Sequence, residues 1–254
     1  MGKVHSHASS AVFFCQPVRG PGFGPKREWR PMETHFFLGL PAVIASGPMK
    51  RLLERIRRAA QNDSGVLIHG EAGTGKELLA RALHHYAGRP GAPWLEVHCA
   101  TAAAGGRYLW EMAYGGTLFL NGVAELAAVQ QTRLLRELDG GTDVRVVAAT
   151  HLDLGRAART GQFRRDLYRK LSGIQVEVPP LRHRPTDIIP LADFFLAQSN
   201  PAAWLGADAR QALRRYPWPG NVRELRQVIT AAAVVNPGAE VRARDLPEGV
   251  VGRP

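Results

Sequence analysis

The amino-acid sequence predicts an α/β fold: a five-stranded parallel sheet flanked by helices and followed by a small helical unit. Apolar runs of strand length alternate with segments of helical periodicity as far as about residue 180, which is typical of a parallel sheet with crossover helices. A glycine-rich loop that ends in a lysine joins the first of these strands to the helix behind it. From Asp187 onward the periodicity is helical only.

Composition narrows the class of protein. The chain has 254 residues and an apolar fraction of 45%, which is typical of globular proteins. No apolar run has transmembrane length, so we expect no membrane contact and a cytoplasmic protein. Cys15 and Cys99 provide neither a disulfide framework nor a metal cluster. The net charge of +11 comes mainly from scattered arginines, which favours solvated helix faces and leaves a nucleic-acid surface as the alternative.

The chain divides into three predicted parts. Residues 1–38 are rich in Gly, Pro, His, Ser and Arg without periodicity, and we expect them to be disordered. We expect the α/β core over residues 39–184 and the helical unit over residues 185–250. The first helix of the core begins near Pro48. Its apolar residues recur at helical spacing: Met49, Leu52, Leu53 and Ile56.

Five segments have the length and apolar character of buried strands. They are Val66–Ile68, Trp94–His98, Thr117–Leu120, Val144–Ala149 and Ile174–Val178. A helix over Ala127–Leu138 precedes the fourth strand. Ligands of parallel sheets bind beyond the carboxyl ends of the strands, so the loops that follow these strands are where site residues are expected.

The loop after the first strand has the layout of a phosphate-binding loop. It reads Gly70, Glu71, Ala72, Gly73, Thr74, Gly75, Lys76, Glu77. The glycines let several backbone N–H groups point at one anion, the following helix adds the positive end of its dipole, and Lys76 adds a full charge. Glu77 stands where such loops usually carry the Ser or Thr that binds magnesium. An ordinary glycine-rich turn before a helix is the alternative interpretation.

One sequence pattern in the helical unit predicts where a helix begins. Asn221 and Glu224, three residues apart, predict a capping box that starts a helix reaching about Val235. We expect this unit to cover the nucleotide cleft as a lid.

Six motifs in order resemble the AAA+ domain of bacterial enhancer-binding proteins, the activators of sigma-54 RNA polymerase. They are Gly70–Glu77, Gly115–Leu120, Val144–Thr150, Phe163–Leu171, Pro179–Arg184 and Trp218–Leu225. The resemblance covers roughly residues 40–248, and the family also carries Glu at the position of Glu77. It implies a AAA+ sheet and lid, and a homo- or hetero-oligomeric ring that binds ATP and Mg²⁺. It also implies RNA polymerase or a sigma-54 activator relative as partner. Arg223 matches the lid arginine that reaches toward the γ-phosphate.

The third strand departs from the family pattern. The family has Asp-Glu at its end, the Asp for hydrated magnesium and the Glu for the attacking water, whereas this chain has Asn121 and Gly122. Asn121 lacks the charge that a hard cation prefers, so we expect at most a weak, water-mediated magnesium contact. Gly122 provides no general base, a loss that typically reduces rates by about 10²- to 10⁴-fold. Glu125 is a possible substitute, and His98 replaces the family's Asn at the end of the second strand.

Other family elements are absent or altered. No GAFTGA string, the family's contact with sigma-54, occurs between Cys99 and Gly115. His151 stands at a sensor position where Asn is usual. Arg164 matches the first trans-acting arginine and Lys170 the second, although a lysine lacks the bidentate fork of an arginine. Surface charge on a helix is the alternative for both. No helix-turn-helix is expected after the lid, which leaves DNA contact open.

These observations predict an ATP-binding module of transcription regulation with impaired hydrolysis. Two alternatives remain. One is a slow but active ATPase that uses an unexpected base. The other is a basic nucleic-acid-binding protein that retains the fold as a scaffold.

Overall fold

The computed structural model describes residues 34–88, 91–101, 107–236 and 240–252. The expectation of disorder for residues 1–33 therefore lies outside the described residues. Ordered backbone begins earlier than the expected boundary at residue 38, because strand β1 (Thr34–Phe37) pairs antiparallel with β2 (Leu40–Val43). The boundary lies earlier because the buried ring of Phe37 packs edge-on against the rings of His85 and Tyr86 and so orders strand β1.

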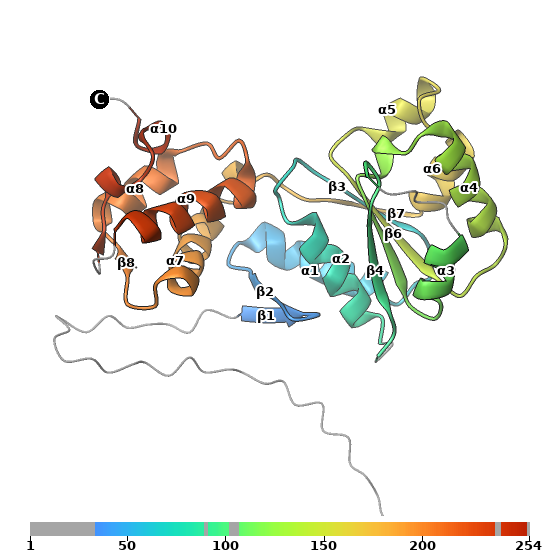
Figure 1. The fold of residues 1–254 in the computed structure, drawn as a ribbon, viewed down its shortest axis with the longest axis horizontal. Helices are drawn as coiled ribbons and strands as arrows, with labels where there is room; N and C mark the ends of the chain where they lie inside the picture. The colour runs from blue at the N-terminus through green and yellow to red at the C-terminus, as the bar shows by residue number, and fades with distance from the viewer. Residues whose placement is uncertain (1–33, 89–90, 102–106, 237–239, 253–254) are drawn as a thin grey trace, which may run out of the picture. The chain divides into compact units, whose positions relative to one another are not determined.

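The central sheet has five parallel strands, as predicted, and the structure places them in the order β4-β5-β6-β3-β7 (Figure 1). The strands are β3 (Val66–His69), β4 (Trp94–His98), β5 (Thr117–Asn121), β6 (Arg145–Thr150) and β7 (Ile174–Glu177). The register pairs His69 with Thr150 and Asn121 with Ala149. The carboxyl ends of β3, β6 and β5 therefore lie side by side, and the loops that follow them share one edge of the sheet.

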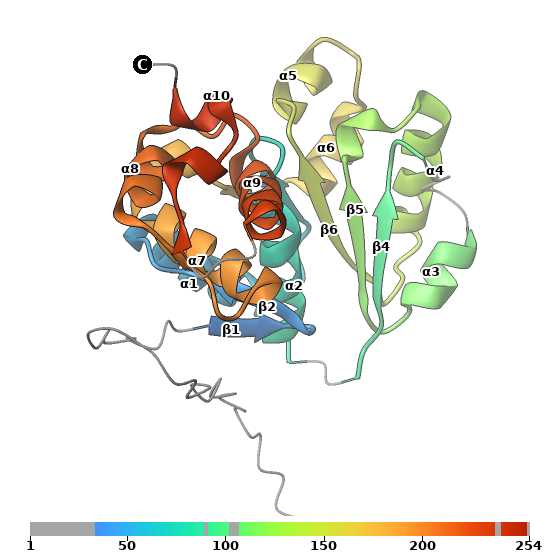
Figure 2. The ribbon, with the colours of Figure 1, turned by 60° about the vertical axis from the view of Figure 1, so that its left-hand side comes forward.

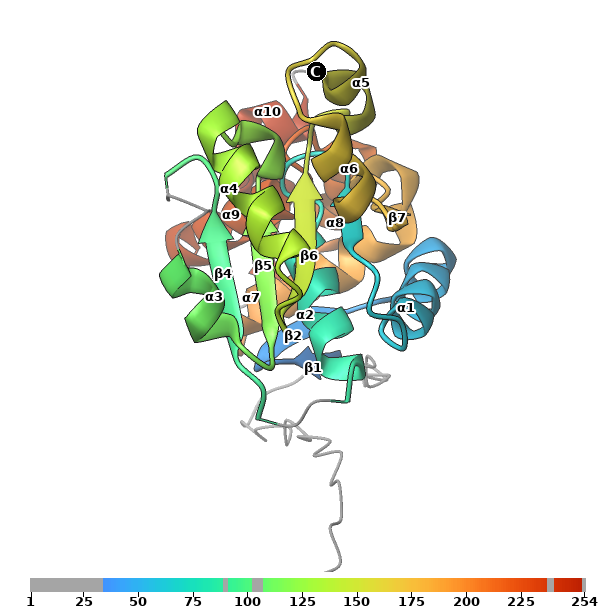
Figure 3. The same cartoon turned by 90° about the vertical axis from the view of Figure 1, so that its right-hand side faces the viewer.

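Helices cover both faces of this sheet because its strand residues alternate in direction. Val66 and Ile68 point into one buried cluster with the apolar residues of α1 (Gly47–Ala59) and α2 (Lys76–Tyr86). Leu67 points into the opposite cluster. The helices of that second face, several of them in front of the sheet in Figure 3, are α3 (Arg107–Ala113), α4 (Ala128–Asp139), α5 (Leu154–Arg159) and α6 (Arg165–Leu171).

The C-terminal part is a helical unit with its own core. Figure 2 shows its helices grouped together: α7 (Ile188–Ser199), α8 (Ala207–Arg215), α9 (Asn221–Val235) and α10 (Glu248–Val251). Two short strands, β8 (Trp204–Leu205) and β9 (Glu240–Val241), pair in parallel. Trp218 is fully buried in this core, and its Nε1 donates a hydrogen bond of 2.9 Å to the carbonyl of Leu213. Among the described residues, no helix combines the length and apolarity that a bilayer crossing requires.

Short 3₁₀ helices connect these elements. They are η1 (Val123–Glu125), η2 (Leu181–His183), η3 (Pro185–Asp187) and η4 (Ala243–Asp245). The two on either side of Arg184, η2 and η3, connect β7 to the helical unit.

A buried Arg–Asp pair joins three segments at this connection. Asp187 accepts hydrogen bonds from the backbone N–H groups of Ala45 and Ser46, at 3.0 and 2.6 Å, which fixes the start of α1. Arg184 lies 3.6 Å from Asp187 and donates at 2.6 Å to the carbonyl of Thr74 in the glycine-rich loop. Both side chains are almost completely buried, so each depends on the other for charge compensation.

Replacing Asp187 by Ala should lower the free energy of unfolding by about 3–5 kcal/mol, because Arg184 would remain as a buried charge without its carboxylate. Urea unfolding measures the loss. Asp193→Ala is the matched control, since it removes the acidic partner of Arg210 at a site where both side chains are about one-fifth exposed. We expect a much smaller loss there. Equal losses in the two variants would contradict a special dependence on the buried pair.

Candidate nucleotide-binding site

The glycine-rich loop has the backbone geometry of a phosphate-binding loop. Gly73 and Gly75 have φ angles of 75° and 98°, a region that side-chain-bearing residues rarely occupy. Gly75 immediately precedes α2, so the N-terminus of that helix opens onto the loop. At the other end of the loop, the N–H of Gly70 donates to the carbonyl of Thr150 at 3.2 Å. The loop is therefore attached to the end of β6.

Positive charge converges on this loop. The Nζ of Lys76 donates hydrogen bonds of 2.7 and 2.8 Å to the carbonyls of Gly70 and Glu71. Burial, together with the nearby charge of Arg223, lowers the pKa of Lys76 to about 8. Two cations and a helix N-terminus thus meet where the loop would receive an anion, and a bound anion would favour the charged form of the lysine.

Arg223 reaches the loop through the backbone of α9. The N–H groups of Val222 and Arg223 donate to the carbonyl of Gly73, at 2.9 and 3.3 Å. The approach is so close that a Cβ atom on Gly73 would lie 2.3 Å from the carbonyl oxygen of Gly220. Gly73 is thus required both for its φ angle and for this contact.

Asn221 does not act as the cap that the sequence predicts. Its φ of 55° is left-handed and its side chain is fully buried. The Oδ1 of Asn221 accepts from the N–H of Leu181 at 2.7 Å, and its Nδ2 donates to the carbonyl of Ala72 at 3.0 Å. The carboxylate of Glu224 accepts from the N–H of Gly220 at 2.7 Å, one residue before the cap position that the sequence predicts. Asn221 therefore connects α9 to the loop instead of capping the helix.

The carboxylate of Glu71 points toward the helical unit. Arg182 binds it with two hydrogen bonds of 2.9 and 2.5 Å, and Asn221 donates a third at 3.1 Å. These donors, Arg182 first, lower the pKa of Glu71 to about 2. The sequence placed Glu71 among the nucleotide-binding residues. In the structure its side chain contacts Arg182 and Asn221, while its backbone forms part of the loop.

At the end of β5, Asn121 joins a polar network instead of presenting a carboxylate. Its Nδ2 donates at 3.2 Å to Glu96 on the neighbouring strand β4. The Glu96 carboxylate also lies 3.6 Å from His98 and 3.7 Å from Arg81. Arg81 in turn holds Glu77 at 2.8 Å.

This network fits poorly with a tightly bound Mg²⁺. The amide of Asn121 is neutral, and the carboxylates of Glu77 and Glu96 are both engaged by Arg81. No group of three or more His, Cys, Asp or Glu side chains suited to a metal ion occurs within the part of the chain that the structure describes.

Gly122 has a backbone adapted to the lack of a side chain. Its φ is 77°, and a Cβ atom built there would lie 3.0 Å from the carboxylate of Glu125. Glu125 also lies 4.0 Å from Nδ1 of His151 at the end of β6. The carboxylate nearest to the missing acid is therefore that of Glu125, and it is about one-third exposed.

The two candidate trans-acting cations pair with carboxylates outside this loop. Arg164 pairs with Asp166 at 2.6 Å and Lys170 pairs with Asp139 at 2.6 Å, all with substantially exposed side chains. The structure thus brings Lys76, the loop and Arg223 together but does not bring Arg164 or Lys170 to them within one chain.

Sequence reasoning assigned no role to the side chains of Arg182, Arg184 and Glu96. The first two belong to the Pro179–Arg184 motif, in which two arginines close together after a pair of prolines could have indicated a role. Glu96 lies between Leu95 and Val97 in its strand, and no sequence pattern around it indicated a role in the site.

Comparison with known proteins places this site in a family. A family described as "Sigma-54 interaction domain" matches residues 43–181, and "AAA+ ATPase lid domain" matches residues 182–253. The transcriptional regulatory protein ZraR of Klebsiella oxytoca is 38% identical over 252 residues, covering 84% of this chain and 56% of its own length. The Nif-specific regulatory protein of Rhodobacter capsulatus is 37% identical over 248 residues, covering 82% and 42%.

A solved structure agrees with these relatives. NtrX from Brucella abortus in complex with ATP superposes with a TM-score of 0.74 at 32% identity, covering 82% of this chain and 57% of that chain. The chain spans about half the length of the curated relatives it matches. It belongs to the sigma-54 interaction domain family, with a AAA+ lid behind the core. The resemblance predicted from the six motifs is confirmed.

Raising the pH through about 8 should weaken triphosphate binding at the loop, because Lys76 carries its positive charge below its lowered pKa and loses it above. Titration with a fluorescent ATP analogue from about pH 7 to about pH 9.5 should show a roughly tenfold rise in the dissociation constant. Lys76→Arg, which stays charged throughout, should show an affinity independent of pH. A wild-type affinity that is constant over this range would contradict the assignment.

Proposed function

We propose that this chain is an ATP-binding AAA+ module of transcription regulation whose hydrolysis of ATP is weak or absent. One observation carries the proposal. The cations that would hold a triphosphate, Lys76 and Arg223, converge on a complete phosphate-binding loop, while the strand end beside them presents Asn121 and Gly122 instead of two acids.

In this proposal the nucleotide is held mainly by the loop. The N–H groups between Gly73 and Lys76 and the N-terminus of α2 bind phosphate oxygens. Lys76 exchanges its two carbonyl acceptors for the outer phosphates, and Arg223 reaches the same phosphates from α9. The ATP complex of the NtrX relative supports this assignment at 32% identity.

Hydrolysis is weak because nothing at residue 122 can take a proton from water. A general base typically contributes about 10²- to 10⁴-fold to the rate. The neutral amide of Asn121 would contact Mg²⁺ weakly and through water, since its own N–H donates to Glu96. ATP binding and ATP cleavage are thereby separated within one site.

Assembly into a ring is the natural context for such a module. Arg164 and Lys170 are substantially exposed and would have to exchange Asp166 and Asp139 for the nucleotide of a neighbouring subunit. The sigma-54 family membership supports a partner among activator relatives or RNA polymerase. We propose that the chain acts as a nucleotide-binding member of such an assembly.

A slow ATPase is the second candidate, and one contact favours it. The carboxylate of Glu125 lies against Gly122 and near His151, where it could orient a water molecule. This function would require measurable turnover that depends on Glu125.

ATP binding and phosphate release should be measured on one purified sample. We expect wild-type binding that Lys76→Ala abolishes, because the variant removes the full charge at the loop, together with phosphate release near background. Phosphate release at the rate of an intact family member would contradict the proposal. If slow release is found and Glu125→Gln removes it, the second candidate replaces the first.

Restoring the two acids should increase hydrolysis. The double variant Asn121→Asp with Gly122→Glu should raise phosphate release by up to about 10²- to 10⁴-fold. A left-handed backbone at residue 122 opposes the change by about 1–2 kcal/mol, so the gain should be at the lower end. Asn121→Asp with Gly122→Gln introduces the same strain without a base and is the control. An equal rate in the two double variants would show that the missing base does not limit hydrolysis.

A further inference from the structure

Helix α1 presents an exposed face with an unusual excess of positive charge. Within its thirteen residues lie five cations and a single carboxylate, Glu54. The cations are Lys50, Arg51, Arg55, Arg57 and Arg58, all exposed. Arg51 and Arg55 are four residues apart, a spacing at which like charges repel each other across one helical turn.

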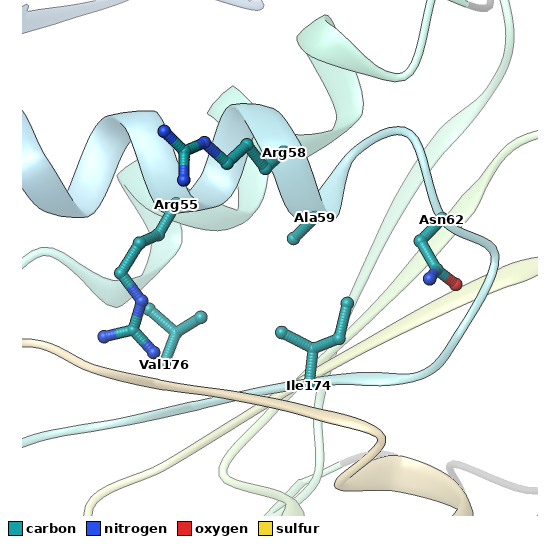
Figure 4. Close-up of a pocket in the computed structure, with 6 residues that line it drawn as sticks. All are labelled: Arg55, Arg58, Ala59, Asn62, Ile174 and Val176. Carbon is teal, nitrogen blue, oxygen red and sulfur yellow. The ribbon is translucent and has the colours of Figure 1, made fainter.

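Two adjoining hollows run along this face. One, of about 660 Å³, is lined by Lys50 and Arg51 and has Ile44 and Leu53 in its apolar wall. The other, of about 260 Å³, lies between α1 and the edge strand β7 (Figure 4). Figure 4 shows Arg55 extending from α1 toward Val176, with Ile174 opposite Ala59. Arg55 and Arg58 line both hollows, so the two form one basic groove.

The cations of this groove have no acidic partner within the part of the chain that the structure describes, unlike several arginines elsewhere. Elsewhere Arg81, Arg182 and Arg210 each bind a carboxylate within 2.9 Å. Among the described residues, Lys50, Arg51 and Arg58 form no ion pair with an acid, and Arg55 donates only to the carbonyl of Gln175, at 3.1 Å. Glu54 is the one carboxylate among the residues that line the two hollows, against four cations, so the groove keeps a net positive charge for an anion from outside the chain.

The helix itself does not explain this charge. Basic residues in the last turn, Arg57 and Arg58, compensate the helix dipole. Lys50 and Arg51 lie in the N-terminal half, where the dipole disfavours cations and where the first turn contains no acid. The fold thus keeps two cations at an unfavourable end of α1, beside a hollow.

We propose that the α1 groove, formed by Lys50, Arg51, Arg55 and Arg58, binds the phosphodiester backbone of nucleic acid without reading its sequence. Successive cations on one helix face are spaced by about one 5.4 Å turn, which suits successive phosphates of a polyanion. The net charge of +11 brings such a polymer to the protein over long range. This binding is independent of the nucleotide site at Lys76.

Anisotropy titration of a fluorescein-labelled DNA duplex tests the groove, with saturating ATP present so that the phosphate-binding loop is engaged. We expect wild-type affinity to fall with rising potassium chloride, because bound phosphates release counterions. Arg51→Glu with Arg58→Glu should weaken binding at least tenfold and flatten the salt dependence. Arg55 is left unchanged because it binds β7.

The matched control is Arg214→Glu with Arg215→Glu. These exposed residues end helix α8, and the double variant changes the net charge by the same amount. We expect it to weaken duplex binding less than threefold. Equal losses in the two double variants would contradict nucleic-acid binding at the α1 groove, since overall charge would then explain the binding. Absence of wild-type binding would also overturn it.

Two further readouts separate the possible outcomes. Urea unfolding of both double variants should match the wild type, which excludes loss of the fold as the cause. Displacement of the duplex by inorganic tripolyphosphate at equal phosphate concentration would assign the groove to small phosphate compounds and overturn nucleic acid as the ligand. Because duplex binding is read directly, failure of ATP binding at Lys76 would leave this test intact.

Discussion

The phosphate-binding loop keeps its shape because hydrogen bonds from three other segments hold its backbone. Thr150 at the end of β6 accepts from Gly70, Arg184 donates to Thr74, and Asn221 donates to Ala72. Each contact joins residues far apart in the chain, and two of the side chains that make them are buried. A loop rich in glycine has many alternative conformations, so these contacts select the one whose N–H groups converge.

The same contacts couple the loop to the helical unit. The Gly73 carbonyl accepts from the first turn of α9, and Glu71 is bound by Arg182 and Asn221. This arrangement places Arg223 near Lys76, because the backbone N–H groups of Val222 and Arg223 donate to the Gly73 carbonyl. The cations that favour a triphosphate are therefore positioned by the fold before the ligand arrives, which reduces the ordering that binding requires.

Local patterns were sufficient to predict the sheet, the loop and the lid. The alternation of strands with helices is a short-range signal, and the fold confirmed it. The spacing of glycines before Lys76 is another, and the loop has the left-handed glycines that it requires, while its contacts with a nucleotide stay a prediction. Interactions between distant residues were not predictable in this way. Asn221 has the sequence context of a cap, but its partners Ala72 and Leu181 become visible only once the loop and the connection pack against α9. Phe37 likewise orders β1 through His85 and Tyr86.

The backbone conformation at Gly122 could not be predicted from the sequence either. The change to Gly122 was read correctly as the loss of a side chain, yet its left-handed φ and the approach of Glu125 could be known only from the structure. The proposed function requires that the phosphate-binding loop bind ATP without hydrolysing it. Phosphorus NMR of ATP mixed with an equimolar amount of protein and magnesium tests it most directly. We expect shifted phosphate resonances whose intensities persist for hours. An unshifted spectrum, or steady growth of ADP and inorganic phosphate signals, would rule out this function.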